Sequence, residues 1–334
     1  MSRSVRIPIG AVTGVGSVPH CDPSEAVDFV LRTQSRLPAA PQLPARSPNE
    51  SMLGQAIVGM RGVTLDPVGG LKVDLDEFAP AEGGDSLSSD AFVGMRAFLN
   101  AVVDRTGPVK VQLTGAVTLA VELIRAGVPP RLAFDAATKT LEVRVGEIMG
   151  VMERRLPQVG RVLVFDEPWL TALRGEGLPA SPVQVLDALA RILGVGSEWA
   201  TVGVHCCGPT DWSLVLSAGP DLLSAPVWAG LEEAAGSLAR FLDRGGWVAW
   251  GVVPTSRPIG MTSERLWRSL AAHWCSLVRG GCDPVVLRAR ALVTPECGLA
   301  RHGLAQAEQV MAFAAVIADR LGQEAIGVRL QLGA

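Results

Sequence analysis

Residues 201–207 read Thr-Val-Gly-Val-His-Cys-Cys, and this short run carries both a structural and a chemical signal. Its apolar, β-branched first half is typical of a buried strand, and its end is rich in metal-binding side chains. Side chains alternate along a strand, so His205 and Cys207 point to one side and Cys206 to the other. The run therefore predicts a strand that presents an imidazole and a thiol together at its carboxyl end.

Comparable apolar runs recur along the chain, and longer segments with helical periodicity separate them. The predicted strands cover residues 11–17, 41–44, 109–114, 162–165, 201–205, 222–227, 247–253 and 291–293. About eight such strand–helix units predict an α/β fold, a single TIM (β/α)8 barrel. Residues 56–92 form an irregular insertion with a hairpin near residues 63–78. No linker is visible, so residues 1–334 are predicted to be one domain.

The alternative architecture is an open, doubly wound sheet. Polar or unusual residues follow almost every predicted strand, and this pattern favours the barrel. A barrel brings the carboxyl ends of all its strands to one rim, whereas an open sheet spreads them along a line. We therefore expect these residues to converge at one mouth.

The composition limits the classes of function. The chain has 334 residues, 48% of them hydrophobic, and a formal net charge of −3. It has no basic run for nucleic acid and no apolar stretch of roughly 20 residues for a membrane span. Residues 1–12 lack the apolar core of a signal peptide, so a cytoplasmic location is expected. In that compartment the six cysteines are expected to be free thiols or metal ligands in preference to disulfides.

Three residues form a predicted zinc site. His205 and Cys207 alone could equally be small buried core residues. Cys297 follows the last strand, and closure of a barrel brings that strand to the same mouth. Zinc favours nitrogen and sulfur ligands, and a catalytic zinc keeps one open position beside three protein ligands. We therefore predict zinc bound by His205, Cys207 and Cys297.

Two other strand ends are predicted to bind substrate. Asp166 and Glu167 end the fourth strand, where a carboxylate could hold an ammonium group, and alternation lets only one of them face the mouth. The alternatives are a helix cap or a salt bridge. Gly16 and Ser17 end the first strand and could bind a carboxylate through a hydroxyl and a backbone amide. The alternative there is a plain turn.

Five short motifs together resemble the C-terminal catalytic barrel of cobalamin-independent methionine synthase, within the superfamily that includes uroporphyrinogen decarboxylase. They occupy residues 13–19, 113–118, 165–168, 204–207 and 294–298. The resemblance implies a TIM barrel with zinc on the His-x-Cys pair and the late Cys. It also implies that Gly16-Ser17 grips the carboxylate of homocysteine and that Asp166, as a catalytic residue, meets its amino group.

The chain departs from that family at three points. The family places a fourth zinc ligand, a glutamate, on the strand after the His-x-Cys strand, and residues 221–227 contain none. A glutamate near the second strand is also missing from residues 42–47. The full-length enzymes carry a further N-terminal barrel that helps bind the folate donor, whereas this chain has one barrel.

These observations predict a zinc-dependent methyltransferase. It would activate a thiol, with homocysteine as the first choice, as a zinc thiolate that attacks methyltetrahydrofolate or a methylcorrinoid. The predicted partners are the small-molecule thiol and methyl donor, and a corrinoid protein if the donor is a corrinoid. The alternatives are a corrinoid-linked transferase for another thiol and a catalytically silent barrel that binds zinc or a thiol.

Overall fold

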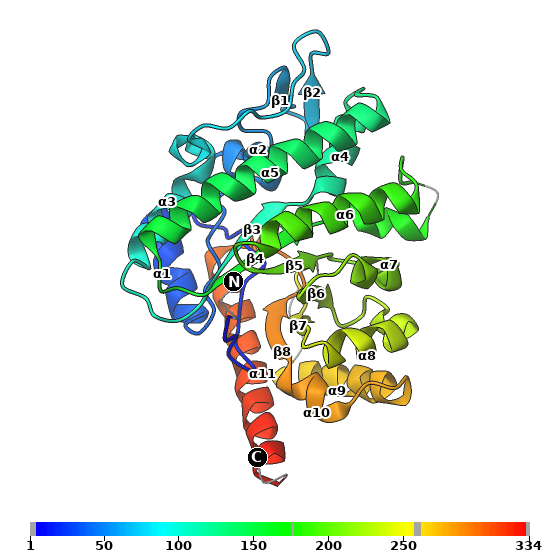
Figure 1. Ribbon diagram of the computed structural model, residues 1–334. Coiled ribbons are helices and arrows are strands. Elements are labelled where there is room, and N and C mark those ends of the chain that lie inside the picture. The colour runs from blue at the N-terminus through cyan, green and yellow to red at the C-terminus, as the bar shows by residue number, and fades with distance from the viewer. Residues whose placement is uncertain (1–4, 176, 257–261, 332–334) are drawn as a thin grey trace.

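A curled parallel sheet of six strands organises the structure, a computed structural model that describes residues 5–175, 177–256 and 262–331 (Figure 1). Within these residues the sheet order follows the sequence. The strands are β3 (Val109–Thr114), β4 (Arg161–Asp166), β5 (Thr201–His205), β6 (Leu222–Pro226), β7 (Trp247–Val253) and β8 (Ala291–Pro295). All six were predicted within a few residues, and β3, β5 and β7 have the predicted bounds. The α/β class is therefore confirmed.

The predicted strands at residues 11–17 and 41–44 are not strands in the structure. They take part only in isolated parallel bridges, Val12 with Val293 and Ser17 with Gln42, and Ala39, two residues before the second segment, bridges to Lys110. These bridges link β8 to the first segment, the first segment to the second, and the second to β3. Pro38, Pro41 and Pro44 have no amide hydrogen to donate, so a continuous ladder cannot form along the second segment.

Two buried side chains of β3 replace part of the missing ladder. The Lys110 Nζ donates to the carbonyl of Val15 at 2.7 Å, and the Gln112 Nε2 donates to the carbonyl of Ala40 at 2.7 Å. Both bonds tie a bridged segment to the sheet. A Cβ on Gly16 would lie 2.6 Å from the Gln112 amide, so only glycine lets the first segment approach this closely.

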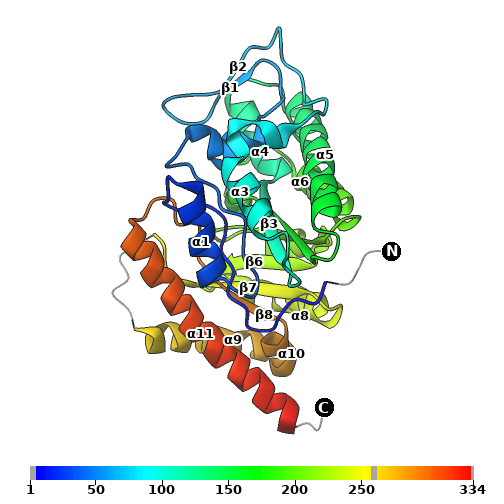
Figure 2. The same ribbon diagram turned by 90° about the vertical axis from the view of Figure 1, so that its left-hand side faces the viewer.

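Helices cover the outer face of the sheet (Figures 1 and 2). They are α1 (Pro23–Thr33), α2 (Met52–Ala56), α3 (Val93–Ala101), α4 (Ala116–Arg125), α5 (Pro130–Arg155), α6 (Pro182–Ser197), α7 (Trp212–Ser217), α8 (Ala235–Asp243), α9 (Ser263–Arg279), α10 (Pro284–Ala289) and α11 (Leu304–Gln331). The helical segment between β3 and β4 is divided into α4 and α5, because Gly127 adopts a φ of 100° and Pro129 precedes α5. α11 packs against β8 and α1.

The insertion near residues 56–92 contains the predicted hairpin, with β1 (Val63–Leu65) antiparallel to β2 (Leu71–Val73). The hairpin packs next to α2 and α4 (Figure 1). Short 3-10 helices cover Pro48–Glu50, Ser86–Ser88, Asp90–Phe92, Pro168–Arg174 and Leu231–Ala234. No helix within the described ranges is both long and apolar enough to cross a bilayer.

The sheet separates two apolar cores. The larger core lies between the sheet and the helices and includes Leu163, Phe165 and Val204. The smaller one lies on the inner face, and its buried members are Ile7, Ala11, Leu37, Val162, Val164, Leu222, Ala249 and Leu292. Because side chains alternate, Asp166 shares the inner face with Val162 and Val164, whereas Glu167 does not. Strand-end residues that alternate in step with the small core, such as Asp166, therefore face inward.

Candidate functional site

A row of polar side chains crosses the sheet at the carboxyl ends of β3 to β6. Strand register places Thr114 beside Asp166, Asp166 beside His205, and His205 beside Ser224. Parallel strands present their carboxyl ends at one edge, so these residues are neighbours although they span more than 100 residues of sequence. The predicted convergence of strand-end residues is therefore present for this part of the sheet.

Four buried polar atoms at this end have no hydrogen-bond partner among the described residues. They are the Thr13 Oγ1, Asp166 Oδ1, His205 Nε2 and Thr294 Oγ1. Three of these residues, Thr13, Asp166 and Thr294, lie two positions after a residue of the small inner core. Burying a polar atom without a partner costs about 1–3 kcal/mol, so native structures rarely tolerate several together. Such a group indicates a place where a ligand or bound water completes the hydrogen bonding.

His205 is oriented by one ring nitrogen and leaves the other available. Its Nδ1 lies 2.9 Å from the Ser224 Oγ, and the residue is 4% exposed. Ligating histidines characteristically use the second ring nitrogen in such a bond, which fixes the tautomer and the ring orientation. Ser224 was not identified from the sequence, because a serine inside an apolar strand carries no distinctive pattern.

The structure brings Cys207 and Cys297 together. The interaction between the two thiols lowers the pKa of Cys207 and, together with burial, raises the pKa of Cys297 to about 12, and the neighbouring His205 opposes that rise. Cys206 faces away from this group, where burial raises its pKa to about 12. The three residues predicted from the sequence as zinc ligands are thus mutual neighbours.

The donor set fits zinc, although its donor atoms are not yet arranged around an ion. Among the described residues, no group of three or more His, Cys, Asp or Glu side chains is in position to hold a metal. The unpartnered His205 Nε2 and the paired thiols nevertheless have the chemistry that zinc prefers. Zinc ligation by His205, Cys207 and Cys297 stays a prediction.

Ser17 lies against the loop that carries Cys297. The Leu299 amide donates to the Ser17 carbonyl at 2.7 Å, and a Cβ on Gly298 would lie 2.0 Å from the Ser17 Oγ. Glycine at position 298 is therefore what lets these two loops meet. The structure thus places Ser17 against the residues that follow Cys297, and the carboxylate-binding role of Gly16 and Ser17 stays a prediction.

A buried lysine accompanies Asp166 on the inner face. Burial raises the pKa of Asp166 to about 7, and the positive charge of Lys110 opposes that rise. Lys110 is itself buried, which lowers its pKa to about 8. Sequence reasoning missed Lys110, although the alternation of Lys110, Gln112 and Thr114 along one strand is a detectable signal of a polar inner face.

Glu167 faces the opposite side and caps a helix. Its two carboxylate oxygens accept hydrogen bonds from the Val117 and Thr118 amides, at 3.0 and 2.7 Å, at the start of α4. The residue is fully buried, and burial raises its pKa to about 7. These contacts correspond to the alternative interpretation, a helix cap. The substrate-binding role predicted for Glu167 stays untested, but both oxygens are already engaged.

Gly115→Ala is expected to destabilise the protein through this cap. The new Cβ would lie 2.1 Å from the Glu167 carboxyl carbon, while the φ of −80° at Gly115 suits alanine. Displacing the carboxylate removes two charge-assisted hydrogen bonds, so we expect a loss of about 3 kcal/mol in the free energy of unfolding, measured by urea denaturation.

Gly146→Ala is the matched control, because a Cβ there meets nothing within 4 Å. It should not lower stability. In a Glu167→Ala background, Gly115→Ala should cost less than about 1 kcal/mol, since the clashing group is gone. An undiminished cost in that background would show that Gly115 acts through something other than Glu167.

A cavity of about 630 Å³ adjoins the site beside β3 and β4. Its lining includes Met52, Thr118 and Trp169, and the hairpin loop at Asp66. The Trp169 Nε1 donates to the Glu122 Oε1 at 2.7 Å, which fixes the indole. Cavities of about 300–1,000 Å³ commonly hold drug-sized ligands, so this one has room for a second substrate.

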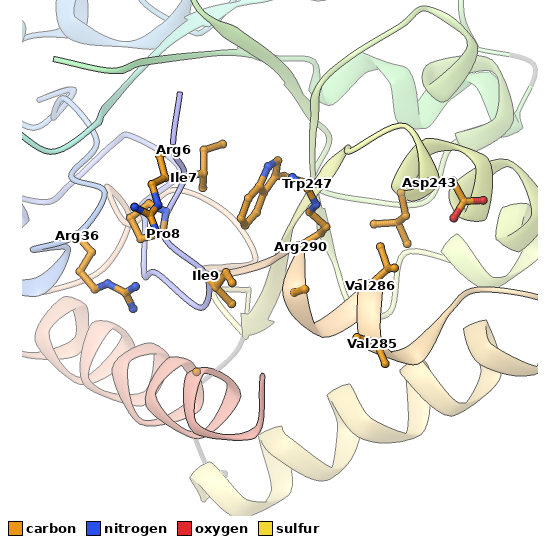
Figure 3. A pocket seen from close by; sticks show the side chains of 13 residues that line it. Arg6, Ile7, Pro8, Ile9, Arg36, Asp243, Trp247, Val285, Val286 and Arg290 are labelled. Carbon is orange, nitrogen blue, oxygen red and sulfur yellow. The ribbon is translucent and has the colours of Figure 1, made fainter. Parts of the chain in front are cut away.

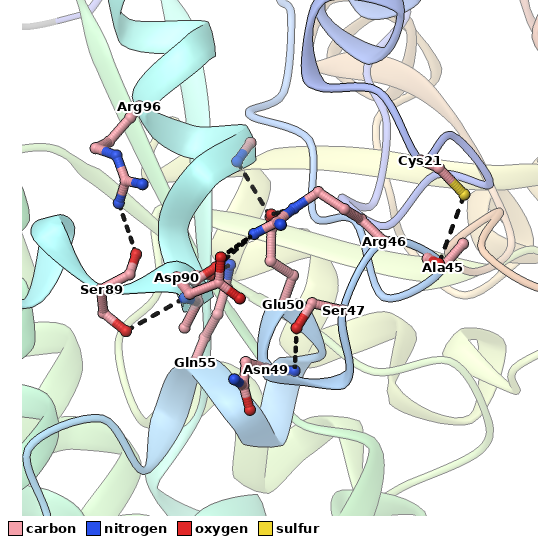
Figure 4. A network of polar contacts seen from close by, with 12 residues as sticks. Cys21, Ala45, Arg46, Ser47, Asn49, Glu50, Gln55, Ser89, Asp90 and Arg96 are labelled. Atoms are coloured by element: carbon pink, nitrogen blue, oxygen red, sulfur yellow. Dashed lines mark hydrogen bonds and ion pairs between the residues drawn. The ribbon is translucent and has the colours of Figure 1, made fainter.

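The glutamate missing from residues 42–47 is not replaced by its buried neighbour Glu50. The Glu50 carboxylate accepts from the Arg46 Nε at 2.7 Å and from the Gly94 amide at 3.1 Å (Figure 4). Arg46 also pairs with Asp90. Both oxygens of the Glu50 carboxylate therefore take part in a structural network.

Comparison with known proteins supports the fold. No family model and no curated protein matches the chain. A B12-independent methionine synthase from a Shewanella species, solved with selenomethionine, has a TM-score of 0.63 at 13% identity, covering 96% of this chain and 100% of that one. A proposed vitamin-B12-independent methionine synthase from Listeria monocytogenes has a TM-score of 0.56 at 11% identity, covering 90% and 86%. At these identities the likeness shows a shared fold.

Proposed function

We propose that this protein is a zinc-dependent methyltransferase that activates a small-molecule thiol, with homocysteine as the first candidate. The observation that carries the proposal is the group of unpartnered buried atoms, including the His205 Nε2 and Asp166 Oδ1, beside two paired thiols. The fold shared with B12-independent methionine synthases supports it. The bridged segments at residues 11–17 and 41–44 would complete the eight positions of a TIM barrel around this site.

Each residue has a distinct part in the proposed reaction. His205, Cys207 and Cys297 would hold the metal, and Ser224 orients the imidazole through its hydrogen bond. When bound there, zinc would keep the acceptor sulfur deprotonated and therefore nucleophilic at neutral pH. Asp166 would receive the ammonium group of the acceptor on its unpartnered oxygen.

The methyl donor would occupy the neighbouring cavity. Its wall includes Pro168 and Trp169, which directly follow the end of β4 that carries Asp166. The donor is a methyltetrahydrofolate or a methylcorrinoid, the latter either free or carried by a partner protein. The cavity suits a planar ring system, since the Trp169 indole is part of its wall.

Methyl transfer is tested directly with the full chain loaded with zinc. Homocysteine is incubated with methyltetrahydrofolate or methylcobalamin, and methionine is quantified by mass spectrometry. Methionine formation with either donor, lost in Cys207→Ser, would support the proposal, and the visible absorption change of methylcobalamin would identify a corrinoid donor. If zinc and homocysteine bind but no thiol is methylated by either donor, the protein is a silent zinc- and thiol-binding barrel and the methyltransferase proposal fails.

Ser224→Ala is expected to weaken zinc binding about 10-fold to 100-fold, because the imidazole loses the partner that fixes its tautomer. Competition with a chromophoric chelator measures this. Ser237→Ala is the control, since that serine is on the outer helix α8 and bonds Ser213. Equal zinc affinity in Ser224→Ala and wild type would contradict a role for His205 as a ligand.

A further inference from the structure

A second cavity opens at the amino ends of the strands, opposite the candidate site. Its volume is about 900 Å³. Trp247 begins β7, and Arg290 directly precedes β8, so both mark the amino end of the sheet. Figure 3 shows Arg6 and Arg36 on one side of this cavity and Arg290, beside Trp247, on the other. Neither the zinc ligands nor Asp166 line it.

The walls of this cavity are mainly apolar. Ile7 and Ile9 come from the amino-terminal segment, Trp247 from β7, and Val285 and Val286 from α10. Ile7 belongs to the inner core, and Trp247 packs partly buried against that core. The cavity floor is therefore continuous with the inner apolar core, and its size matches sites that hold a drug-sized ligand.

Three arginines give the cavity a positive charge. Arg6, Arg36 and Arg290 line it together with one acid, Asp243. The structure gives these three guanidinium groups neither a salt bridge nor a hydrogen bond to any described residue. The guanidinium of Arg290 lies 5.2 Å from the centre of the Trp247 ring, a cation–π contact that holds it at the cavity wall.

We propose that this cavity binds an organic anion with an apolar body, such as an aryl or acyl carboxylate, sulfonate or phosphate. The apolar walls would bury the body, and the arginines would pair with the acidic group in charge-assisted hydrogen bonds. The excess of positive charge favours an anion over a neutral ligand. Such a site at the amino ends of the strands is separate from chemistry at the carboxyl ends.

The fluorescent probe anilinonaphthalene sulfonate tests this site in the full-length protein. We expect saturable binding of one probe per chain, weakened at least about fivefold in Arg290→Gln and in Arg36→Gln. Binding should also weaken as salt is raised, because these arginines are partly exposed. N-phenylnaphthylamine, which has the same rings without the sulfonate, should bind wild type and both variants alike.

Arg131→Gln is the matched control, because this exposed arginine lies on α5 and does not line the cavity. It makes the same change in net charge and should leave the affinity for the sulfonate unchanged. Unfolding curves for all variants establish that the fold is retained. Equal affinities in wild type, Arg290→Gln and Arg36→Gln, or an equal loss in Arg131→Gln, would overturn the proposal.

Discussion

Cys207→Ser is expected to reduce the zinc content of the purified protein from about one ion per chain to a small fraction of that. A serine hydroxyl remains protonated at neutral pH and is a poor zinc ligand, whereas a thiolate is among the best. The loss leaves only His205 and Cys297 in the proposed set. Elemental analysis of protein purified under reducing conditions without added metal measures the content directly.

Cys206→Ser and Cys275→Ser are the controls for that experiment. Cys206 is adjacent in sequence but faces the apolar core, and Cys275 is exposed on α9. Both variants should keep their zinc. Replacement of zinc by cobalt adds a second measurement, since thiolate-to-cobalt absorption bands should be weaker in Cys207→Ser. A wild-type protein that takes up no zinc even after reconstitution would contradict the predicted metal site and the proposed methyl transfer with it.

The sequence was sufficient to predict the six regular strands, because each is a short apolar run or, in β3, an alternation of apolar and polar residues between helical segments. It failed at residues 11–17 and 41–44, where a few backbone hydrogen bonds form isolated bridges and side chains distant in sequence add further bonds. Gln112 and Lys110 hold those segments through hydrogen bonds to Ala40 and Val15. A pattern of local apolar residues contains no information about such bonds.

The candidate site could be predicted where the alternation of side chains along a strand determines which residues share a face. The opposite orientations of His205 and Cys206 followed directly from strand geometry, and the structure agrees. For Asp166 and Glu167, alternation showed that only one could face inward, but not which one. That choice depends on the register of β4 against its neighbours, which places Asp166 beside His205. Lys110 was missed because a lysine ordinarily indicates an exposed position, although it alternates with Gln112 and Thr114 along a buried strand.

Asp166→Asn is expected to weaken homocysteine binding to the zinc-loaded protein about 30-fold, or about 2 kcal/mol. Asparagine has the same shape but no charge, so it removes the attraction for an ammonium group and the interaction with the charge of Lys110. Mercaptobutyrate, which is homocysteine without its amino group, should bind wild type and variant equally. Isothermal titration calorimetry with both thiols separates this loss from any general damage to the site.

The pH dependence of the same pair of ligands tests the charge on Asp166. Because burial raises its pKa to about 7, the carboxyl is charged above that pH and becomes neutral as the pH falls through it. The preference of wild type for homocysteine over mercaptobutyrate should therefore be full above about pH 8 and shrink below pH 7. Asp166→Asn is titrated with the same two thiols, so any difference in the ionisation of the ligands themselves is the same for both proteins and cancels between them. A preference that persists unchanged in Asp166→Asn would mean that another group, and not Asp166, recognises the amino group.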